Sequence, residues 1–395
     1  MKKNLLFVMN NLNCGGAEKA LISLLETIDY SRFEVDLLLF KKEGLFLSKV
    51  PSQVNLLNEI NEFTFFDMPI KEAINKSIKQ QRFDITFSRI RAGIIYKTEK
   101  NGAKCEQKAW NQIRWILKPL KKNYDVAIGY LEKNPIYYCV DKVKAHYKIG
   151  FIHNDYNKLG MIPKMDQQYF RQLDSLVTVS EECANILIEV FPDLKEKIEV
   201  MYNIISPEVI RQLSLDESLE ATSKIKLVSV GRLNYQKGFE MAIDACKLLV
   251  EKGYEVVWDI LGEGEEREKL ETLVQETNLN GIVNFLGIKE NPYPFIKNAD
   301  IYVQPSRFEG KSIAIDEAKI LHKPIVVTNF STAKDQIKNN HNGLIVGMDS
   351  TSLANGIEKL ILDPALRDQL SDNLSKEKLG TTEEIIKFYR FIHAI

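Results

Sequence analysis

The stretch DIYVQPSRFEGKSIAIDEAK, residues 300–319, is the part of the sequence that most clearly predicts the fold. Its first residues, Asp300–Gln304, are typical of a buried strand. A loop follows in which Gly310 permits an unusual backbone turn. Ser312 is then placed as the N-cap of a helix with an apolar face. A strand that continues through a short loop into a helix is the repeating part of a parallel α/β sheet.

The same alternation of short apolar runs and helical segments continues along most of the chain. This pattern is typical of βαβ units whose parallel sheet is covered by helices on both faces. The first series of predicted strands is Leu5–Asn10, Glu34–Phe40, Val54–Leu57, Asp125–Tyr130, Lys148–His153, Ser175–Val179 and Ile198–Tyr202. The second series is Lys226–Val230, Val256–Leu261, Val283–Leu286, Asp300–Gln304, Pro324–Thr328 and Gly343–Val346. Two series of strands predict an α/β protein with two Rossmann-like domains.

The predicted domain boundary is the polar stretch 206–224, in which we find no strand. A chain of 395 residues is longer than one hydrophobic core usually serves, so two domains are expected. We predict an N-terminal domain over 1–205 and a C-terminal domain over 225–378, joined by that linker. The last segment, 379–395, has a threonine cap and a wide apolar stripe, and we expect a helix that packs against the rest of the protein.

The composition is that of an ordinary globular protein. It is 45% hydrophobic and 27% charged, with a net charge of −1, which gives no indication of a nucleic-acid partner. No apolar run reaches the length of about 18 residues that a membrane span needs, and the N-terminus lacks a signal-peptide pattern. The cysteines show neither zinc-ligand nor disulfide spacing, so we expect a cytoplasmic protein. These cysteines are Cys14, Cys105, Cys139, Cys183 and Cys246.

One segment departs from this balance. Residues 71–122 contain fourteen Lys and Arg but four acidic residues, a net charge of +10. Aromatic and aliphatic residues such as Phe87 and Trp115 lie between the charges, as in helices that rest on an anionic membrane. The alternative is a basic helical insert with a solvated charged face, whose aromatic residues belong to the core. The sequence leaves both interpretations open.

Candidate ligand-binding residues follow several of the predicted strands, where open α/β sheets bind their ligands. Arg232 and Lys237, in the loop GRLNYQKGF, could hold a diphosphate. Glu309 and Glu317 flank a helix start whose free N–H groups attract anions, so a phosphate could lie between acids that bind sugar hydroxyls. A salt-bridged surface turn is the alternative for this pair. Further candidates are Gly15 and Gly16 after the first strand and Gly287 and Ile288 after Val283–Leu286.

Together these motifs resemble the retaining glycosyltransferases of family 4. Glu309 and Glu317 match the family's E-x7-E element, and GRLNYQKGF matches its phosphate-binding loop. GGAEK resembles its first glycine-rich loop, and GFIHND at 150–155 resembles the segment whose histidine faces the donor sugar, here His153. The resemblance implies a GT-B fold, in which two Rossmann-like domains face each other across a cleft. We expect the C-terminal helix to cross back to the N-terminal domain.

The resemblance also implies roles for single residues. Arg232 and Lys237 would neutralise the leaving diphosphate, and Glu317 would bind the ribose. Glu309 would bind the sugar's C3 and C4 hydroxyls, and His153 would lie at its C6 side. The other residues implied on the donor side are Gly15, Gly16, Gly231, Gly287, Ile288, Gly310, Lys311 and Ser312, the last two through their N–H groups. Those on the acceptor side are Tyr130, Asn154 and Asp155.

Lys311 and Ser312 depart from the family pattern, which often has a bulky apolar residue and then Gly or Pro at these positions. The side chain of Lys311 therefore either reaches solvent or contacts the donor. The sequence lacks a D-x-D triplet, so we expect no metal and no cofactor. The donor is expected to be a UDP-sugar rather than a GDP-sugar, because UDP is the commoner donor nucleotide in the family.

The expected activity is hexosyl transfer to a glycan, lipid-linked or protein acceptor in bacterial surface-glycan synthesis. The enzyme would work in the cytoplasm, with a peripheral contact to the membrane through 71–122. Two alternatives stay open: a sugar-nucleotide 2-epimerase of the same fold, and a non-catalytic partner subunit that resembles a glycosyltransferase.

Overall fold

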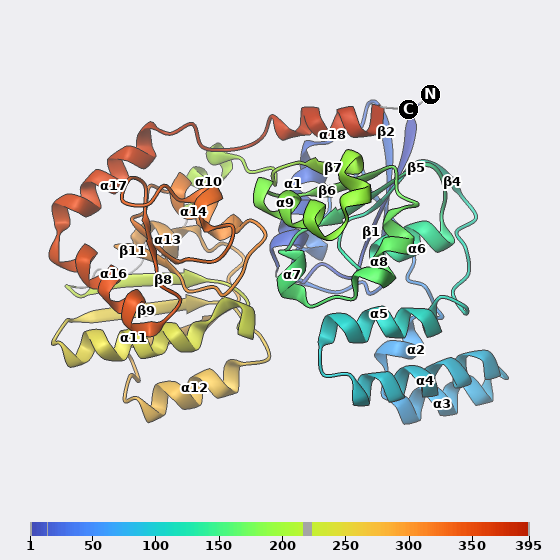
Figure 1. Ribbon diagram of the computed structural model, residues 1–395, viewed down its shortest axis with the longest axis horizontal. Helices are drawn as coiled ribbons and strands as arrows, with labels where there is room; N and C mark the ends of the chain where they lie inside the picture. Colours follow the sequence, from blue (N-terminus) through green and yellow to red (C-terminus); the bar gives the residue numbers. More distant parts are fainter. Residues whose placement is uncertain (1, 14, 216–222, 394–395) are drawn as a thin grey trace. The chain divides into compact units, whose positions relative to one another are not determined.

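The protein consists of two compact units, each built on one parallel sheet (Figure 1). The computed structural model describes residues 2–13, 15–215 and 223–393. The first unit contains Ala17–Asn203, the residues up to Asn13 and those from Glu383 onward, and the second contains Ile204–Thr382 together with Gly15 and Gly16. The α/β fold with two Rossmann-like domains that the strand pattern predicts is thereby confirmed.

The sheet of the first unit has the strand order β3-β2-β1-β4-β5-β6-β7. Strand β1 has an unbroken buried apolar run because helices cover both faces of the sheet. The strand order reverses between β1 and β4, which are neighbours in the sheet but far apart in the chain. The strands are β1 (Lys3–Met9), β2 (Phe33–Leu39), β3 (Asn55–Leu56), β4 (Asn123–Gly129), β5 (Lys144–Ile152), β6 (Ser175–Thr178) and β7 (Ile198–Val200).

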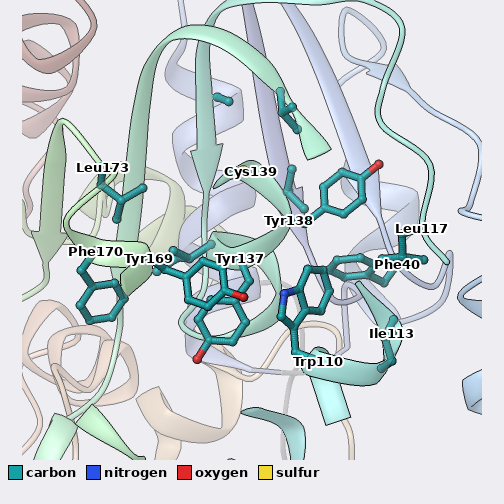
Figure 2. Close-up of a cluster of buried hydrophobic side chains, with 14 of the residues drawn as sticks. Phe40, Trp110, Ile113, Leu117, Tyr137, Tyr138, Cys139, Tyr169, Phe170 and Leu173 are labelled. Carbon is teal, nitrogen blue, oxygen red and sulfur yellow. The ribbon is translucent and has the colours of Figure 1, made fainter. Parts of the chain in front are cut away.

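The helices of the first unit include most of the basic segment 71–122. They are α1 (Gly16–Thr27), α2 (Thr64–Asp67), α3 (Ile70–Lys79), α4 (Phe83–Thr98), α5 (Gly102–Ile113), α6 (Asn134–Lys142), α7 (Tyr156–Leu159), α8 (Pro163–Phe170), α9 (Glu181–Val190) and α18 (Glu384–His393), with 3-10 turns η1 (Leu45–Lys49) and η2 (Pro192–Lys197). Helix α5 attaches this segment to the core. Its Trp110 is buried among Phe40, Tyr137 and Tyr138 (Figure 2), and the indole N–H donates to Asp141 at 3.0 Å.

The sheet of the second unit has the order β10-β9-β8-β11-β12-β13 and reverses between β8 and β11. Its strands are β8 (Ile225–Val230), β9 (Val256–Leu261), β10 (Val283–Gly287), β11 (Ile301–Gln304), β12 (Ile325–Thr328) and β13 (Leu344–Val346). Its helices are α10 (Pro207–Leu213), η3 (Tyr235–Lys237), α11 (Phe239–Glu251), α12 (Arg267–Glu276), α13 (Tyr293–Asn298), α14 (Ile313–Ile320), α15 (Ala333–Gln336), α16 (Ser350–Leu362) and α17 (Pro364–Lys376).

Every predicted strand is present, but the predicted linker differs from the structure. Helix α10 begins inside 206–224 and packs against α13 and α14 of the second unit. Pro207 and Ile210 are buried there, and the Leu213 carbonyl accepts a hydrogen bond from the Asn291 side chain at 2.8 Å. The first part of the predicted linker therefore belongs to the second unit. Its two buried apolar residues are enough to pack one face of a short helix, although the stretch as a whole is polar. Residues 216–222 lie outside the described part of the chain.

The C-terminal helix α18 packs on the first unit, which confirms that the chain crosses back. Phe388 stacks on Phe7 of β1 with ring centroids 6.0 Å apart, and Tyr389 stacks on Phe33 of β2 at 5.6 Å. The hydroxyl of Tyr389 also accepts a hydrogen bond from the Asp29 N–H at 2.8 Å. No helix in the described part of the chain combines the length and apolarity needed to cross a bilayer.

Candidate functional site

The motif-bearing loops of the second unit lie where its strand order reverses. Strand β8 leads into GRLNYQKGF and β11 leads into PSRFEGKS, and the two strands are paired through Leu227 with Ile301 and Val228 with Tyr302. Both loops therefore leave the same edge of the sheet side by side. This edge, at the point of reversal, is where open α/β sheets bind ligands.

Arg307 joins the two loops, although the sequence analysis did not single it out. Its N–H donates to the Gln236 carbonyl at 2.8 Å, and its guanidinium donates to the Tyr235 carbonyl at 2.7 Å and lies 4.0 Å from the Tyr235 ring. Arg307 also forms an ion pair with Glu240. In return, the Gln236 side chain donates to the Phe308 carbonyl at 3.0 Å. These contacts fix the loops relative to each other before any ligand binds.

Gly238 makes this close approach possible. Its φ is +65°, and a Cβ atom there would lie 2.3 Å from the Pro305 carbonyl oxygen. Only glycine combines that backbone angle with that spacing. An unusual turn was expected at Gly310, but among the described residues of these two loops the left-handed glycine is Gly238. Gly310 is buried between β11 and α14.

Lys237 and Glu309 are paired directly. The Lys237 Nζ atom lies 2.6 Å from Glu309 Oε1, and the same oxygen accepts hydrogen bonds from Ser306 Oγ at 2.6 Å and Gln304 Nε2 at 3.2 Å. Glu309 is 5% exposed, so this set of donors compensates for the cost of burying its charge. Arg232, which we grouped with Lys237, is exposed on the same loop. The site thus has one cation fixed by a carboxylate and one at the surface.

Glu317 lies on α14 and is 2% exposed. Its Oε1 accepts a hydrogen bond from the Tyr293 hydroxyl at 3.1 Å. Burial, together with the negative charges of Glu317 and Glu309, raises the pKa of Tyr302 well above its usual value. Both acids are buried, so the surface-turn alternative for this pair is wrong. Among the residues that the structure describes, no group of three or more His, Cys, Asp or Glu side chains could hold a metal ion.

Lys311 and Ser312 are used within the protein. The Lys311 side chain is 10% exposed and its Nζ lies 3.7 Å from Asp316 Oδ2, so the expectation that it reaches solvent is wrong. Ser312 occupies the N-cap position of α14 but makes no side-chain capping bond. Its N–H donates to Gln336 Oε1 at 2.8 Å, and Gln336 Nε2 donates back to the Ser312 carbonyl at 2.8 Å. The N–H group expected to bind the sugar is therefore already occupied by Gln336, a residue the sequence analysis missed.

Glycines bring the backbones after β8, β9 and β10 together. A Cβ at Gly262 would lie 1.9 Å from the Gly231 carbonyl oxygen, and the Gly262 N–H donates to the Gly287 carbonyl at 2.9 Å. A Cβ at Gly231 would lie 3.2 Å from the side chain of Lys237, which passes over it. Gly287 is left-handed at φ +69°, and the side chain of Ile288 is exposed after it. The predicted residues Gly231, Gly287 and Ile288 thus lie at one edge, with Gly262 as an unpredicted member.

Predicted residues also follow strands of the first unit's sheet at its point of reversal. Gly15 and Gly16 come after β1, and Gly16 is the first residue of α1. A Cβ at Gly16 would meet no atom within 4 Å, so the fold does not require glycine there. Glu132 follows β4 and His153 follows β5, the next strand in the sheet.

His153 and Glu132 form a buried polar pair. The His153 N–H donates to Glu132 Oε2 at 3.1 Å, and the Asn154 side chain donates to Glu132 Oε1 at 2.9 Å. Burial lowers the pKa of His153 to about 4, although Glu132 and a backbone hydrogen bond to Tyr130 oppose the shift. His153 Nε2 is buried without a hydrogen-bond partner in the described structure. The backbone partner of the His153 ring is the Tyr130 carbonyl, which can only accept a hydrogen bond. The other ring nitrogen, Nδ1, therefore carries the proton, and Nε2 has a lone pair that can accept a hydrogen bond.

Tyr130 and Asp155, expected on the acceptor side, have structural roles. Tyr130 is 2% exposed, and its ring stacks 4.6 Å from Phe151 and 4.9 Å from His153, so it supports the histidine from within the core. Asp155 Oδ1 accepts hydrogen bonds from the Asn157 and Lys158 N–H groups and caps α7. We therefore assign both residues to the support of the site. Asn154 remains linked to the site through Glu132.

Replacing His153 with glutamine should make folding less sensitive to acid. The unfolded histidine binds a proton near pH 6.5 but the folded one binds it only near pH 4, so protons favour the unfolded state between these values. Between pH 7 and pH 5, the free energy of unfolding should fall by about 2 kcal/mol more in the native protein than in His153→Gln. Chemical denaturation at both pH values measures this difference. Equal losses of stability in the two proteins would show that His153 is not buried in its neutral form.

Residues 211–377, less than half of the chain, match the family model described as "Glycosyl transferases group 1". The chain is 30% identical over 175 residues to an uncharacterized glycosyltransferase of Methanocaldococcus jannaschii, covering 43% of each protein. It is 28% identical over 215 residues to the lipopolysaccharide core biosynthesis glycosyltransferase LpsE of Rhizobium meliloti, covering 54% of this chain and 61% of LpsE. It is 32% identical over 150 residues to the capsular polysaccharide biosynthesis glycosyltransferase CapM of Staphylococcus aureus, covering 36% of this chain and 38% of CapM. The chain thus spans about half the length of the curated relatives it matches.

Solved structures resemble the whole chain. Anabaena HepE in complex with UDP and glucose has a TM-score of 0.71 at 16% identity, and each chain is covered completely. TarM, at 14% identity, has a TM-score of 0.67 with 99% of each chain covered. At these identities the likeness establishes the fold, which is the two-domain GT-B fold of glycosyltransferases.

Proposed function

We propose that this protein is a retaining glycosyltransferase that moves a sugar from a UDP-sugar to a hydroxyl group of an acceptor. The observation that carries the proposal is the arrangement of Lys237, Glu309 and Glu317 at the point of strand reversal in the second unit. The proposal is supported by the matched family model, which covers both loops that hold these residues. The motif resemblance supplies the retaining mechanism and the roles below.

The nucleotide part of the donor would be bound by charge and by a diol. Lys237 and Arg232 would bind the diphosphate, whose negative charge increases as the bond to the sugar breaks, so their attraction is strongest in the transition state. Glu317 would accept hydrogen bonds from both ribose hydroxyls. Because Glu309 already holds Lys237 in place, the cation needs little reorganisation when the donor arrives.

The sugar part would be bound by Glu309, whose carboxylate can accept hydrogen bonds from sugar hydroxyls. In the first unit, the neutral His153 has a lone pair at Nε2 that can accept a hydrogen bond from a hydroxyl group. In the reaction the bond from the sugar C1 to the diphosphate oxygen breaks and a bond from C1 to the acceptor oxygen forms on the same face. A phosphate oxygen of the leaving group takes the acceptor proton, so neither a protein nucleophile nor a metal is required.

The acceptor is proposed from the names of relatives. LpsE and CapM are described as enzymes of lipopolysaccharide core and capsular polysaccharide biosynthesis. A Campylobacter jejuni relative, 28% identical over 221 residues, is named for transfer of N-acetylgalactosamine onto a diphospho-undecaprenol glycan. We therefore propose a bacterial surface glycan as product, built on a glycan or lipid-linked acceptor. UDP is the proposed nucleotide because HepE was solved with UDP.

A donor screen tests this function. The protein is screened against a panel of UDP- and GDP-sugars. A donor that binds should, at about one hundred times its Kd, stabilise the folded protein by about 2.7 kcal/mol, and only the true donor sugar should then be transferred. This stabilisation corresponds to a rise in melting temperature of several degrees. Nucleotide release with a new glycosidic product supports the transferase. Nucleotide release with an altered free sugar and no acceptor product would indicate an epimerase, and the lack of any donor binding would indicate a non-catalytic subunit.

A further inference from the structure

Helix α4 has apolar side chains on both of its faces. Ile85, Arg89 and Ala92, at helical spacing, form the buried face. The opposite face carries large apolar residues that are well exposed: Phe83 (65%), Phe87 (59%), Ile90 (42%) and Ile94 (59%). A surface helix normally places polar residues on its outer face, so this exposed stripe requires an explanation.

The rotation of α4 is fixed, so the stripe cannot turn inward. The buried guanidinium of Arg89 donates to the Phe65 carbonyl at 2.9 Å and to the Met68 carbonyl at 3.0 Å, at the end of α2. On the same side, a Cβ at Gly93 would lie 2.4 Å from Ile70 Cδ1, so α3 packs directly on α4. Turning the stripe toward the core would leave a buried cation without its hydrogen bonds.

The residues around the stripe are strongly basic. Residues 70–98, which form α3 and α4, contain seven Lys and Arg and two acidic residues, a net charge of +5. Arg91 lies next to the stripe with its guanidinium 4.5 Å from the Phe87 ring. Exposed basic residues on the two helices are Lys71, Lys76, Lys79, Arg91 and Lys97. The partner of this face therefore combines an apolar layer with negative charge.

We propose that the exposed face of α4, together with the neighbouring lysines of α3, docks on an anionic lipid membrane. Phe83, Phe87 and Ile94 would insert at the boundary between headgroups and acyl chains, and the lysines and arginines would attract the anionic headgroups. A second copy of the chain fits this face poorly, because a symmetric contact would bring two sets of +5 charges together. The phosphates of a nucleic acid would pair with the lysines and arginines, but the apolar stripe would stay exposed. The docking itself does not rest on the proposed function.

Sedimentation with lipid vesicles tests the proposal. The full chain should bind vesicles of phosphatidylcholine with about 30% phosphatidylglycerol much more tightly than vesicles of phosphatidylcholine alone, and high salt should weaken that binding. The double variant Phe83→Ser/Phe87→Ser should bind the anionic vesicles at least about tenfold more weakly, because it loses the inserted side chains. The matched control is Val209→Ser/Leu362→Ser, which removes equally exposed apolar residues from α10 and α16 of the second unit and should bind like the native protein.

Two further measurements separate this proposal from its competitors. Circular dichroism and the melting temperature should be unchanged in Phe83→Ser/Phe87→Ser, since both side chains are exposed, and its stabilisation by nucleotide should match that of the native protein. Equal binding to neutral and anionic vesicles, or the same binding by both double variants, would overturn the proposal. So would a concentration-dependent dimer that the Phe83→Ser/Phe87→Ser change abolishes, because the stripe would then be covered by a second copy. Failure of the donor screen would leave the vesicle result unaffected.

Discussion

Replacing Lys237 with alanine is expected to lower kcat/KM for sugar transfer by about a thousandfold, the loss seen when one preorganised charge-stabilising donor is removed. The reason lies in where the ammonium sits. It is fixed by Glu309 at 2.6 Å beside the glycine-rich backbone of Gly231, so it is already positioned for a diphosphate. Steady-state assays with the donor found in the screen measure the effect.

The fold of Lys237→Ala should survive. Glu309 keeps its hydrogen bonds from Ser306 and Gln304, but its buried charge loses its cationic partner, so the free energy of unfolding should fall by about 3–5 kcal/mol. Lys247→Ala is the matched control, because Lys247 is an exposed lysine on α11 of the same unit. If both variants kept native turnover, Lys237 would have no part in the reaction.

Replacing Glu309 with glutamine should separate binding of the sugar from binding of the nucleotide. Loss of the charge-assisted hydrogen bonds to the sugar should lower kcat/KM for transfer by about a hundredfold or more. The affinity for UDP alone should stay the same or increase, because Lys237 would then no longer be neutralised by a carboxylate. The glutamine oxygen can still accept from Ser306 and Lys237, so the loop should keep its conformation.

Glu317→Gln is the matched comparison for this second prediction. Glu317 is an equally buried carboxylate on the neighbouring helix, and we assign it to the ribose. Its change should weaken the binding of UDP itself. The assignment of the two acids would be contradicted if Glu309→Gln lost UDP affinity in parallel with its transfer activity.

The sequence was sufficient to predict the strands and the loops that carry the candidate site. Buried parallel strands are almost continuously apolar, and a phosphate-binding loop must follow such a strand, so both leave a local pattern. Strand β5 shows the limit of that pattern. It begins at Lys144 and not at the predicted Lys148. The prediction missed the first residues because they are exposed or only partly buried and do not form an apolar run. Backbone pairing alone extends the strand there.

The residues that support the site were not predictable in this way. Arg307, Gln336 and Glu132 act through partners that lie 21 or more positions away in the sequence. No local pattern marks such a residue, because the sequence around an arginine or glutamine is the same whether its side chain points to solvent or bonds to a distant segment. Lys311 shows the same limit: the sequence left solvent and the donor as alternatives, and the structure pairs its side chain with Asp316.

The basic segment 71–122 was ambiguous for a physical reason. Composition does not tell which side of a helix faces the core, and α4 carries apolar residues on both sides. The structure assigns the residues one by one. Trp110 is buried in the core, whereas Phe87 and Trp115 are exposed. The core interpretation is therefore correct for Trp110, and the membrane interpretation stays a prediction for the exposed residues.

Calorimetric titration of UDP and GDP into the native protein, Lys237→Ala and Glu317→Gln is the most direct test of the central claim, that the loops after β8 and β11 bind a nucleoside diphosphate. We expect the native protein to bind one of the two nucleotides at one site per chain. Each variant should bind it at least about tenfold more weakly, the loss expected for one charged hydrogen-bonding partner. Native affinity in both variants, or no binding of either nucleotide by the native protein, would contradict the account.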